Sequence, residues 1–224
     1  MNNLVIVPCY RRPEYSQKCI ESIEKAQEYP DTLFYLIDDC SNDTTIDILS
    51  NSTLNKVLTV NHENKGLRRN LIDFFKFSKE FKYVFKVDND CLVPKNWLND
   101  LKSVLDEGNV DILSPNVFPS DAAHKYGKQV EELNYMPSKI VGGLWAMKTD
   151  LYKDINFESI DTYGIKGAFN LLNQIIIEKE ARVGWLPSVI FQDMGHHSGN
   201  HPEHIKSEEH LNYSIEVGRS VSWI

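Results

Sequence analysis

The stretch VFKVDNDCLVPKNWL, from Val84 to Leu98, contains the pattern that decides the fold. An apolar run ends abruptly at Asp88, Asn89 and Asp90, and further polar residues follow. Short continuous apolar runs are typical of strands that are buried on both faces, as in parallel sheets covered by helices. The stretch therefore predicts a buried strand whose carboxyl end carries two acidic side chains.

Strand-like and helix-like segments alternate on both sides of this stretch. The predicted strands cover residues 4–8, 33–37, 56–60, 83–87 and 110–115, then part of 140–152, 182–186 and 188–194. The predicted helices cover 15–26, 44–51, about 67–80, 97–109, 168–180 and 207–219, with Asn96 as a capping residue. Residues 118–138 are predicted to form a long loop with one short helix. This alternation predicts an α/β fold with a mostly parallel mixed sheet flanked by helices.

Four polar segments each follow a predicted strand. They are PCYRR (8–12), DDCSND (38–43), NHENKGLRR (61–69) and DNDC (88–91). In open α/β sheets, ligands bind outside the carboxyl ends of the strands. We therefore expect these four loops to meet at one edge and to form the binding site.

Bulk composition narrows the class of protein. The chain has 224 residues, 42% of them hydrophobic, and a formal net charge of −8, which argues against non-specific nucleic-acid binding. No signal-peptide pattern and no apolar run of about 20 residues is visible. The four cysteines are scattered and are expected to be reduced packing residues. These features predict a cytoplasmic protein, with peripheral membrane contact left open.

Asp88 and Asp90 are candidate metal ligands. Residues i and i+2 on an extended segment point to the same side, so both carboxylates can address one point. Two oxygen anions at one point favour a divalent cation such as Mg²⁺ or Mn²⁺, whose remaining ligands are water and a substrate phosphate. The structural alternative is a solvated junction between strand and loop.

Four segments occur in the order found in family 2 glycosyltransferases with the GT-A fold. They are VIVPCYRRPEYSQKCIESI, LIDDCSNDTT, NKGLRRNL and FKVDNDCLVPKNWL. They resemble that family's opening Pro-x-Tyr/Phe-Asn/Arg turn, its Asp-Asp-x-Ser loop, its Asn-x-Gly segment with arginine and its Asp-x-Asp metal motif. GGLWAMKTDLY (142–152) resembles the Gly-Gly segment before the acceptor region. Each motif alone is weak, and the ordered set is specific.

The resemblance implies one GT-A domain over residues 1–224 that transfers a sugar from a nucleotide diphosphate sugar, with UDP as the expected nucleotide. Residues 1–115 would form the nucleotide-sugar-binding half, and residues 116–224 the acceptor-binding half with a C-terminal helix. The acceptor hydroxyl would belong to a glycan, a lipid-linked saccharide, a protein or a modified nucleic acid.

Carried over position by position, the resemblance assigns roles to individual residues. The nucleotide would contact Pro8, Cys9, Tyr10, Arg11, Asp38, Asp39, Asn64, Lys65, Gly66, Arg69, Asp88 and Asn89. Mn²⁺ or Mg²⁺ would bind Asp88, Asp90 and a late histidine, His196 or His197. Gly142, Gly143 and Trp145 would lie in the acceptor and sugar region. The alternatives are that Asp38 and Asp39 cap a turn, that Arg68 and Arg69 are solvated, and that Trp145 and Trp185 pack in the core.

The catalytic base is where the chain departs from the family pattern. Many inverting members carry a Glu-Asp pair where this chain reads SIDTYGIKGAF (159–169). An inverting transfer needs a base within reach of the acceptor hydroxyl, and Asp161 is the first candidate and Glu158 the second. If neither serves, a retaining mechanism or an inactive protein, such as a non-catalytic nucleotide or glycan binding module, is expected. A nucleotidyltransferase with the same fold is a further alternative, which a glycine-rich phosphate loop near the N-terminus would favour, and VPCYRRPE (7–14) lacks glycine.

Four of the seven histidines fall in the segment DMGHHSGNHPEH (193–204). A zinc site made by His197, His201 and His204 is one alternative to the late metal ligand. A lid loop with hinges at Gly195 and Gly199 is another, and a polar surface loop is the third.

Overall fold

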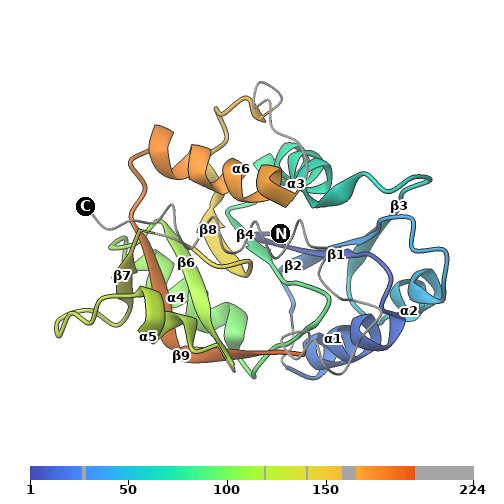
Figure 1. The fold of residues 1–224 in the computed structure, drawn as a ribbon, viewed down its shortest axis with the longest axis horizontal. Helices are drawn as coiled ribbons and strands as arrows, with labels where there is room; N and C mark the ends of the chain where they lie inside the picture. Colours follow the sequence, from blue (N-terminus) through green and yellow to red (C-terminus); the bar gives the residue numbers. More distant parts are fainter. Residues whose placement is uncertain (27–28, 119, 140, 158–164, 195–224) are drawn as a thin grey trace.

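The computed structural model of the chain describes residues 1–26, 29–118, 120–139, 141–157 and 165–194. Its first half alternates strand and helix, and each element predicted there is present (Figure 1). The elements are β1 (Asn3–Cys9), α1 (Pro13–Ala26), β2 (Thr32–Asp38), α2 (Thr45–Asn51), β3 (Lys56–Val60), α3 (Gly66–Phe77), a 3-10 turn (Ser78–Glu80) and β4 (Tyr83–Lys86).

The second half is more irregular. Its elements are β5 (Cys91–Leu92), α4 (Trp97–Asp106), β6 (Ile112–Phe118), α5 (Ala122–Tyr126), β7 (Met136–Ser138), β8 (Trp145–Lys148), a 3-10 turn (Thr149–Leu151), α6 (Ile165–Glu178) and β9 (Val183–Asp193). The described strands form one sheet in the order β3-β2-β1-β4-β8-β6-β9-β5, and β7 pairs with β9. β1 to β4 are parallel to one another, whereas β8 runs antiparallel between β4 and β6.

Helices cover both faces of the sheet. In β1, Val5 and Val7 point to the face that packs against α1, α2 and α4, and Leu4 and Ile6 point to the face covered by α3 and α6. This alternation follows from the period of two in a strand. Because both faces are covered, a ligand has access to the sheet only at its edges, as expected for a parallel α/β fold.

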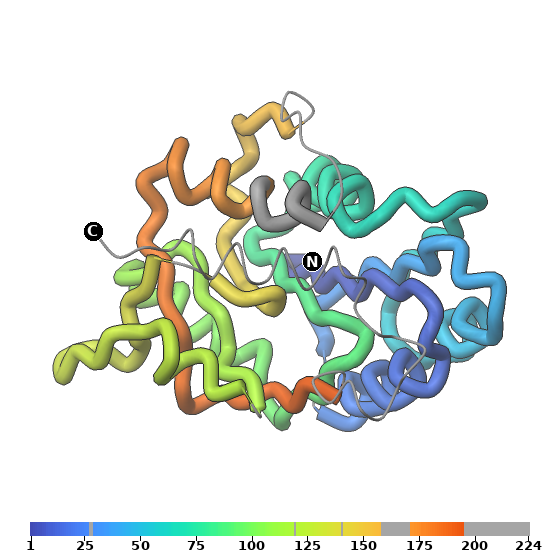
Figure 2. The backbone as a smooth tube through the Cα atoms, viewed as in Figure 1, coloured from blue at the N-terminus to red at the C-terminus, as the bar shows by residue number. Residues whose placement is uncertain are grey.

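β9 is one strand of 11 residues where the sequence predicted two. The predicted break at Pro187 appears as a shift in register, since Pro115 pairs with Leu186 while Asn116 pairs with Ile190. Proline cannot donate to a ladder, so β9 bulges there and then resumes its pairing with β6. Figure 2 shows β9, in orange to red, running beside the light green β6.

Asn96 stands at the start of α4 as predicted, but its side chain makes no capping hydrogen bond and its φ is 60°. The predicted helix over residues 207–219 lies outside the described residues. Among the described helices, none has both the length and the apolar character needed to cross a membrane.

Candidate active site

The carboxyl ends of β1, β2, β3 and β4 lie together, because these strands are parallel neighbours. Hydrogen bonds join the loops that follow them. The N–H of Asp39 donates to the carbonyl of Cys9 over 2.8 Å, and the N–H of Arg11 donates to the hydroxyl of Ser41 over 2.8 Å. The fold therefore brings these loops together at one edge of the sheet, as predicted.

Asp39 anchors the start of α3. Its buried carboxylate accepts hydrogen bonds from the N–H groups of Lys65 (3.0 Å) and Gly66 (2.9 Å) and from the side-chain amide of Asn61 (2.8 Å). Free N–H groups at a helix start carry partial positive charge and stabilise a carboxylate. A carboxylate has about four acceptor sites, and donors among the described residues use three of them, which leaves room for the base N–H that the resemblance assigns to Asp39.

The turn after β2 is held by Asp38, whose Oδ1 accepts a 3.2 Å hydrogen bond from the N–H of Ser41. Cys40 and Asn42 in this turn have φ values of 62° and 56°. In this structure, the hydrogen bonds of both aspartates are therefore those of capping residues. Asp38 caps the turn that directly follows β2. Asp39 caps the start of α3, the helix that follows β3.

Asp88 and Asp90 each contact a different basic side chain. Nη1 of Arg12 lies 2.8 Å from Oδ2 of Asp90, and Nζ of Lys86 donates to Oδ1 of Asp88. The chain turns at Asn89 and Asp90, closed by a 3.1 Å hydrogen bond from Cys91 N–H to the Asp88 carbonyl. The expectation that both carboxylates lie on one extended segment was wrong, since β4 ends at Lys86.

Negative charge is concentrated around Asp90. Burial, followed by the negative charges of Asp88 and Asp193, raises the pKa of its carboxyl to about 6, although the charge of Arg12 acts to lower it. Asp193 reaches this place because β9 pairs with β5, where Asp193 stands opposite Cys91. A cation bound here would relieve the repulsion among these carboxylates.

The donor set suits a hard divalent cation. Asp88 and Asp90 offer carboxylate oxygens, which Mg²⁺ and Mn²⁺ prefer, and such ions complete their shell with water and phosphate. Within the residues that the structure describes, no three His, Cys, Asp or Glu side chains are grouped as metal ligands. The proposed ligands His196 and His197 and the proposed bases Glu158 and Asp161 lie outside those residues.

The Gly-Gly segment lies directly against the acidic pair. The carbonyl of Gly143 accepts a 2.7 Å hydrogen bond from Lys86, and a Cβ at Gly143 would stand 3.0 Å from Oδ2 of Asp88. The N–H of Gly142 donates to the hydroxyl of Ser114 over 3.0 Å. The lack of a side chain at Gly143 therefore allows this segment to approach Asp88 closely.

Both candidate sugar-facing tryptophans are core residues in this structure. Trp145 is 2% exposed and stacks on Phe75, with ring centroids 5.9 Å apart. Trp185 is also 2% exposed and lies against Gly142. The side chain of Trp145 does not reach the surface of the site, so Trp145 is a core packing residue in this structure.

The remaining predicted nucleotide positions vary in exposure. Tyr10 is 41% exposed, and the Arg11 guanidinium lies 5.0 Å from the centre of its ring. Lys65 and Arg69 form ion pairs with Asp73 on α3, at 3.9 Å and 3.3 Å. Pro8 is half-buried, Asn64 is exposed, and the Asn89 side chain donates to Ser16 over 2.9 Å.

Cys9 is buried, and burial raises the pKa of its thiol to about 12. A nucleotide contact at this position therefore falls to the backbone.

Sequence reasoning missed three charged residues at this site, namely Arg12, Lys86 and Asp193. Lys86 carried a detectable signal, because it interrupts an apolar strand at a position that must be buried. Arg12 and Asp193 reach the acidic pair through loop conformation and strand pairing, which no local pattern indicates.

The sequence of residues 4–176 matches the family model described as glycosyl transferase family 2. The chain belongs to this family. The match covers both the loops at the edge of the sheet and the Gly-Gly segment, so the resemblance inferred from the motifs is confirmed.

Curated and solved relatives of this family 2 chain agree with that assignment. The poly(ribitol-phosphate) beta-N-acetylglucosaminyltransferase TarS of Staphylococcus aureus is 34% identical over 116 residues, which cover 49% of this chain and 20% of TarS. The chain thus spans a fifth of the length of the curated relative it matches.

Two solved structures show the same fold. S. aureus TarS 1–349 in complex with UDP-GlcNAc has a TM-score of 0.63 at 22% identity and covers 86% of this chain and 58% of that chain. Mannosyltransferase PcManGT from Pyrobaculum calidifontis, in complex with GDP-Man and Mn²⁺, has a TM-score of 0.68 at 21% identity, with coverages of 96% and 64%. The predicted GT-A fold is confirmed by these likenesses.

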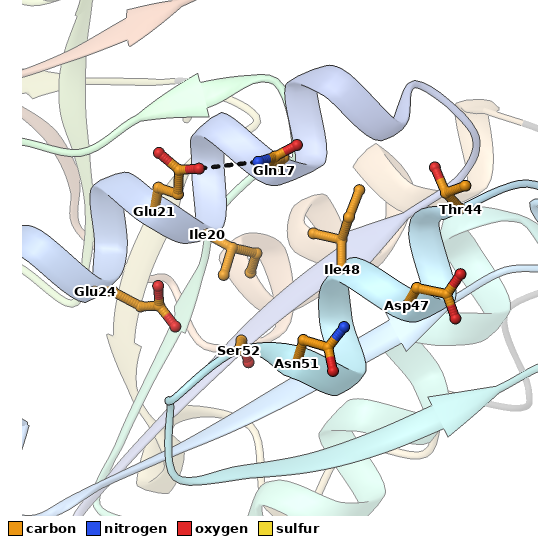
Figure 3. Close-up of a pocket in the computed structure, with 9 residues that line it drawn as sticks. All are labelled: Gln17, Ile20, Glu21, Glu24, Thr44, Asp47, Ile48, Asn51 and Ser52. Carbon is orange, nitrogen blue, oxygen red and sulfur yellow. Dashed lines mark hydrogen bonds between the residues drawn. The ribbon is translucent and has the colours of Figure 1, made fainter.

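A groove of about 370 Å³ lies between α1 and α2 of this family 2 chain (Figure 3). Ile20 and Ile48 face each other across it, and acidic side chains stand along its rim. Glu24 there accepts hydrogen bonds from the N–H and hydroxyl of Thr53, at 2.6 and 2.9 Å. None of the lining residues is a predicted site residue, so this groove is separate from the candidate active site.

Proposed function

We propose that this chain transfers a sugar from a nucleotide diphosphate sugar, of the uridine class, to an acceptor hydroxyl. The observation that carries the proposal is the meeting of Asp88 and Asp90 with the loops after β1, β2 and β3 at one sheet edge. In α/β folds this edge is where nucleotides bind. Residues 1–115 supply the donor half of the proposed site, and the later residues supply the acceptor half.

Relatives support the type of donor. TarS 1–349 has been solved with UDP and with UDP-GlcNAc, and PcManGT has been solved with GDP-Man and Mn²⁺. We favour uridine because the curated relative at 34% identity is TarS. In this chain, the free acceptor site of Asp39 suits an imide N–H, and the exposed ring of Tyr10 suits the flat face of a base.

The metal proposal rests on Asp88 and Asp90 as the residues that would hold Mn²⁺ or Mg²⁺. Such an ion, when bound, neutralises charge on the departing nucleoside diphosphate. Lys86 holds Asp88 in place, and Gly143 leaves space beside it. Asp161, or else Glu158, is proposed as the base that takes the proton of the acceptor hydroxyl in an inverting transfer.

The acceptor is proposed only as a hydroxyl compound. The name of TarS specifies poly(ribitol phosphate), so a polyol phosphate is the first acceptor to test. The net charge of −8 does not favour a polyanion, and glycan, lipid-linked and protein acceptors belong in the same panel.

A binding module without transfer is the competing proposal. One observation favours it, because both carboxylates of the acidic pair already have basic partners within the chain. Hydrolysis of UDP-sugar in the presence of Mn²⁺ separates the two, since a transferase also passes sugar slowly to water and a binding module does not.

Donor binding is tested by thermal unfolding with a panel of nucleotide sugars, with and without Mn²⁺. A ligand at 100 times its Kd stabilises the native state by about 2.7 kcal/mol, which for a chain of this size raises Tm by roughly 5–10 °C. We expect UDP-sugars with Mn²⁺ to give the largest shift and Asp90→Ala to remove the metal-dependent part. An equal shift without metal would refute the metal assignment.

A further inference from the structure

Arg12 forms an ion pair with Asp90, one of the two proposed metal ligands. Its Nη1 lies 2.8 Å from Oδ2 of Asp90, and the two side chains are 29% and 20% exposed. The backbone around Asp90 is fixed, because its carbonyl accepts a 2.8 Å hydrogen bond from the N–H of Met194. Of the two partners, the arginine has the longer and more exposed side chain, so it is the one that can swing away from the ion pair.

The backbone at Arg12 is held in an unfavourable conformation. Arg11 and Arg12 have φ values of 55° and 59°, the left-handed region that non-glycine residues rarely adopt. Hydrogen bonds enforce it, since Ser41 accepts from the N–H of Arg11 and the carbonyl of Arg12 accepts from the N–H groups of Tyr15 and Ser16. This conformation sends the guanidinium of Arg11 over Tyr10 and that of Arg12 to Asp90.

Arg12 and Lys86 differ in how firmly they are held. Lys86 is 3% exposed and contacts both Asp88 and the carbonyl of Gly143. If Lys86 lost its contact with Asp88, its ammonium would remain buried without a counter-charge, which is costly. Arg12 is more exposed, and among the described residues its guanidinium pairs with Asp90. A divalent cation that binds Asp90 would thus replace Arg12 and leave Lys86 in place.

We infer that Arg12 competes with a divalent cation for Asp90 and thereby makes metal binding depend on the donor diphosphate. This inference rests on the proposed function. Metal alone must break the ion pair and leaves the guanidinium beside a new positive charge. A diphosphate bound with the metal gives the displaced guanidinium a partner whose oxygens match its planar fork. Metal and diphosphate should therefore bind with positive cooperativity, and the coupling is reciprocal.

The test is calorimetric titration of Mn²⁺ into the full chain, with and without saturating UDP. For the wild type we expect UDP to tighten Mn²⁺ binding by about tenfold or more, which is within the usual range of coupling between sites. Arg12→Met should bind Mn²⁺ alone several-fold more tightly than the wild type, and UDP should tighten it less. Arg12→Lys keeps the charge and should restore part of the coupling.

Lys18→Met is the matched control, because Lys18 is an exposed cation on α1, the helix that begins directly after Arg12. It should reproduce the wild-type titrations. Arg12→Gln serves in place of Arg12→Met if that variant does not fold. The inference is overturned if UDP tightens Mn²⁺ binding to the wild type but removal of the Arg12 charge leaves Mn²⁺ affinity unchanged or weaker. If Mn²⁺ does not bind the wild type even with UDP, the metal part of the proposed function fails as well.

Discussion

Lys86 and Gly143, 57 residues apart in the chain, are joined by a 2.7 Å hydrogen bond from the ammonium to the carbonyl. The same ammonium contacts Asp88, so one buried lysine connects the acidic turn to the Gly-Gly segment. Breaking a buried pair by removing one partner is strongly destabilising, because it leaves an uncompensated charge. Lys86 is therefore as much part of the site's framework as the aspartates.

Replacing Lys86 by Met should lower the free energy of unfolding by about 2–4 kcal/mol, because Asp88 and the Gly143 carbonyl both lose their donor. Urea denaturation measures this loss. Lys95→Met is the control, since Lys95 is exposed and should change stability by less than about 0.5 kcal/mol. Equal effects of the two substitutions would contradict the bridging role of Lys86.

Gly142→Ala should destabilise the chain by about 1–3 kcal/mol through overpacking. A Cβ at this position would stand 2.7 Å from Cη2 of the buried Trp185. Trp185→Phe removes that part of the ring, so Gly142→Ala should be milder in the Trp185→Phe background. A double-mutant cycle with no coupling energy would show that the indole does not set the need for glycine.

Asp39→Asn should weaken the start of α3 and cost about 1–3 kcal/mol, because an amide N–H₂ would then face one of the chain's own donors. Hydrogen exchange should speed up at the amides of Lys65 and Gly66. The exposed Asp47→Asn on α2 provides the control for charge loss. Unchanged exchange at those two amides would refute the capping role of Asp39.

Only Cys40 of the four cysteines should react with Ellman's reagent in the native protein at pH 8. Burial raises the pKa of the Cys9 thiol to about 12 and raises those of Cys19 and Cys91, so these thiols stay protonated, whereas the thiolate is the reactive form. Cys40 is only half-buried. One thiol should titrate before denaturation and four after it, and Cys40→Ser should abolish the native signal. Rapid reaction of two or more native thiols would contradict this.

The sequence was sufficient to predict the first half of the fold and the meeting of its loops. Apolar runs and helical periodicity are local signals, and parallel pairing then places the loops at one edge. The predicted site residues that the structure brings to this edge include Asp39, Asp88, Asp90 and Gly143. Their roles toward a nucleotide and a metal stay predictions.

What the sequence could not show depends on contacts between distant segments. The buried Lys86 depends on the carbonyl of the distant Gly143 as well as on Asp88, and the position of Asp193 follows from the pairing of β9 with β5. Asp88 and Asp90 do not share one extended segment as predicted, because the strand ends earlier, at Lys86. Local patterns carry no information about such pairings, so the partners of the acidic pair were missed.

The place of β9 in the sheet has a consequence for synthesis of the chain. It is the last described strand, yet it lies between β6 and β5. β6 (residues 112–118) can therefore pair with β9 only after residues 183–193 have been synthesised. On the ribosome, where synthesis adds about 5–20 residues per second, the four-stranded nucleotide half can form first, and Asp193 arrives later at a largely assembled acidic turn.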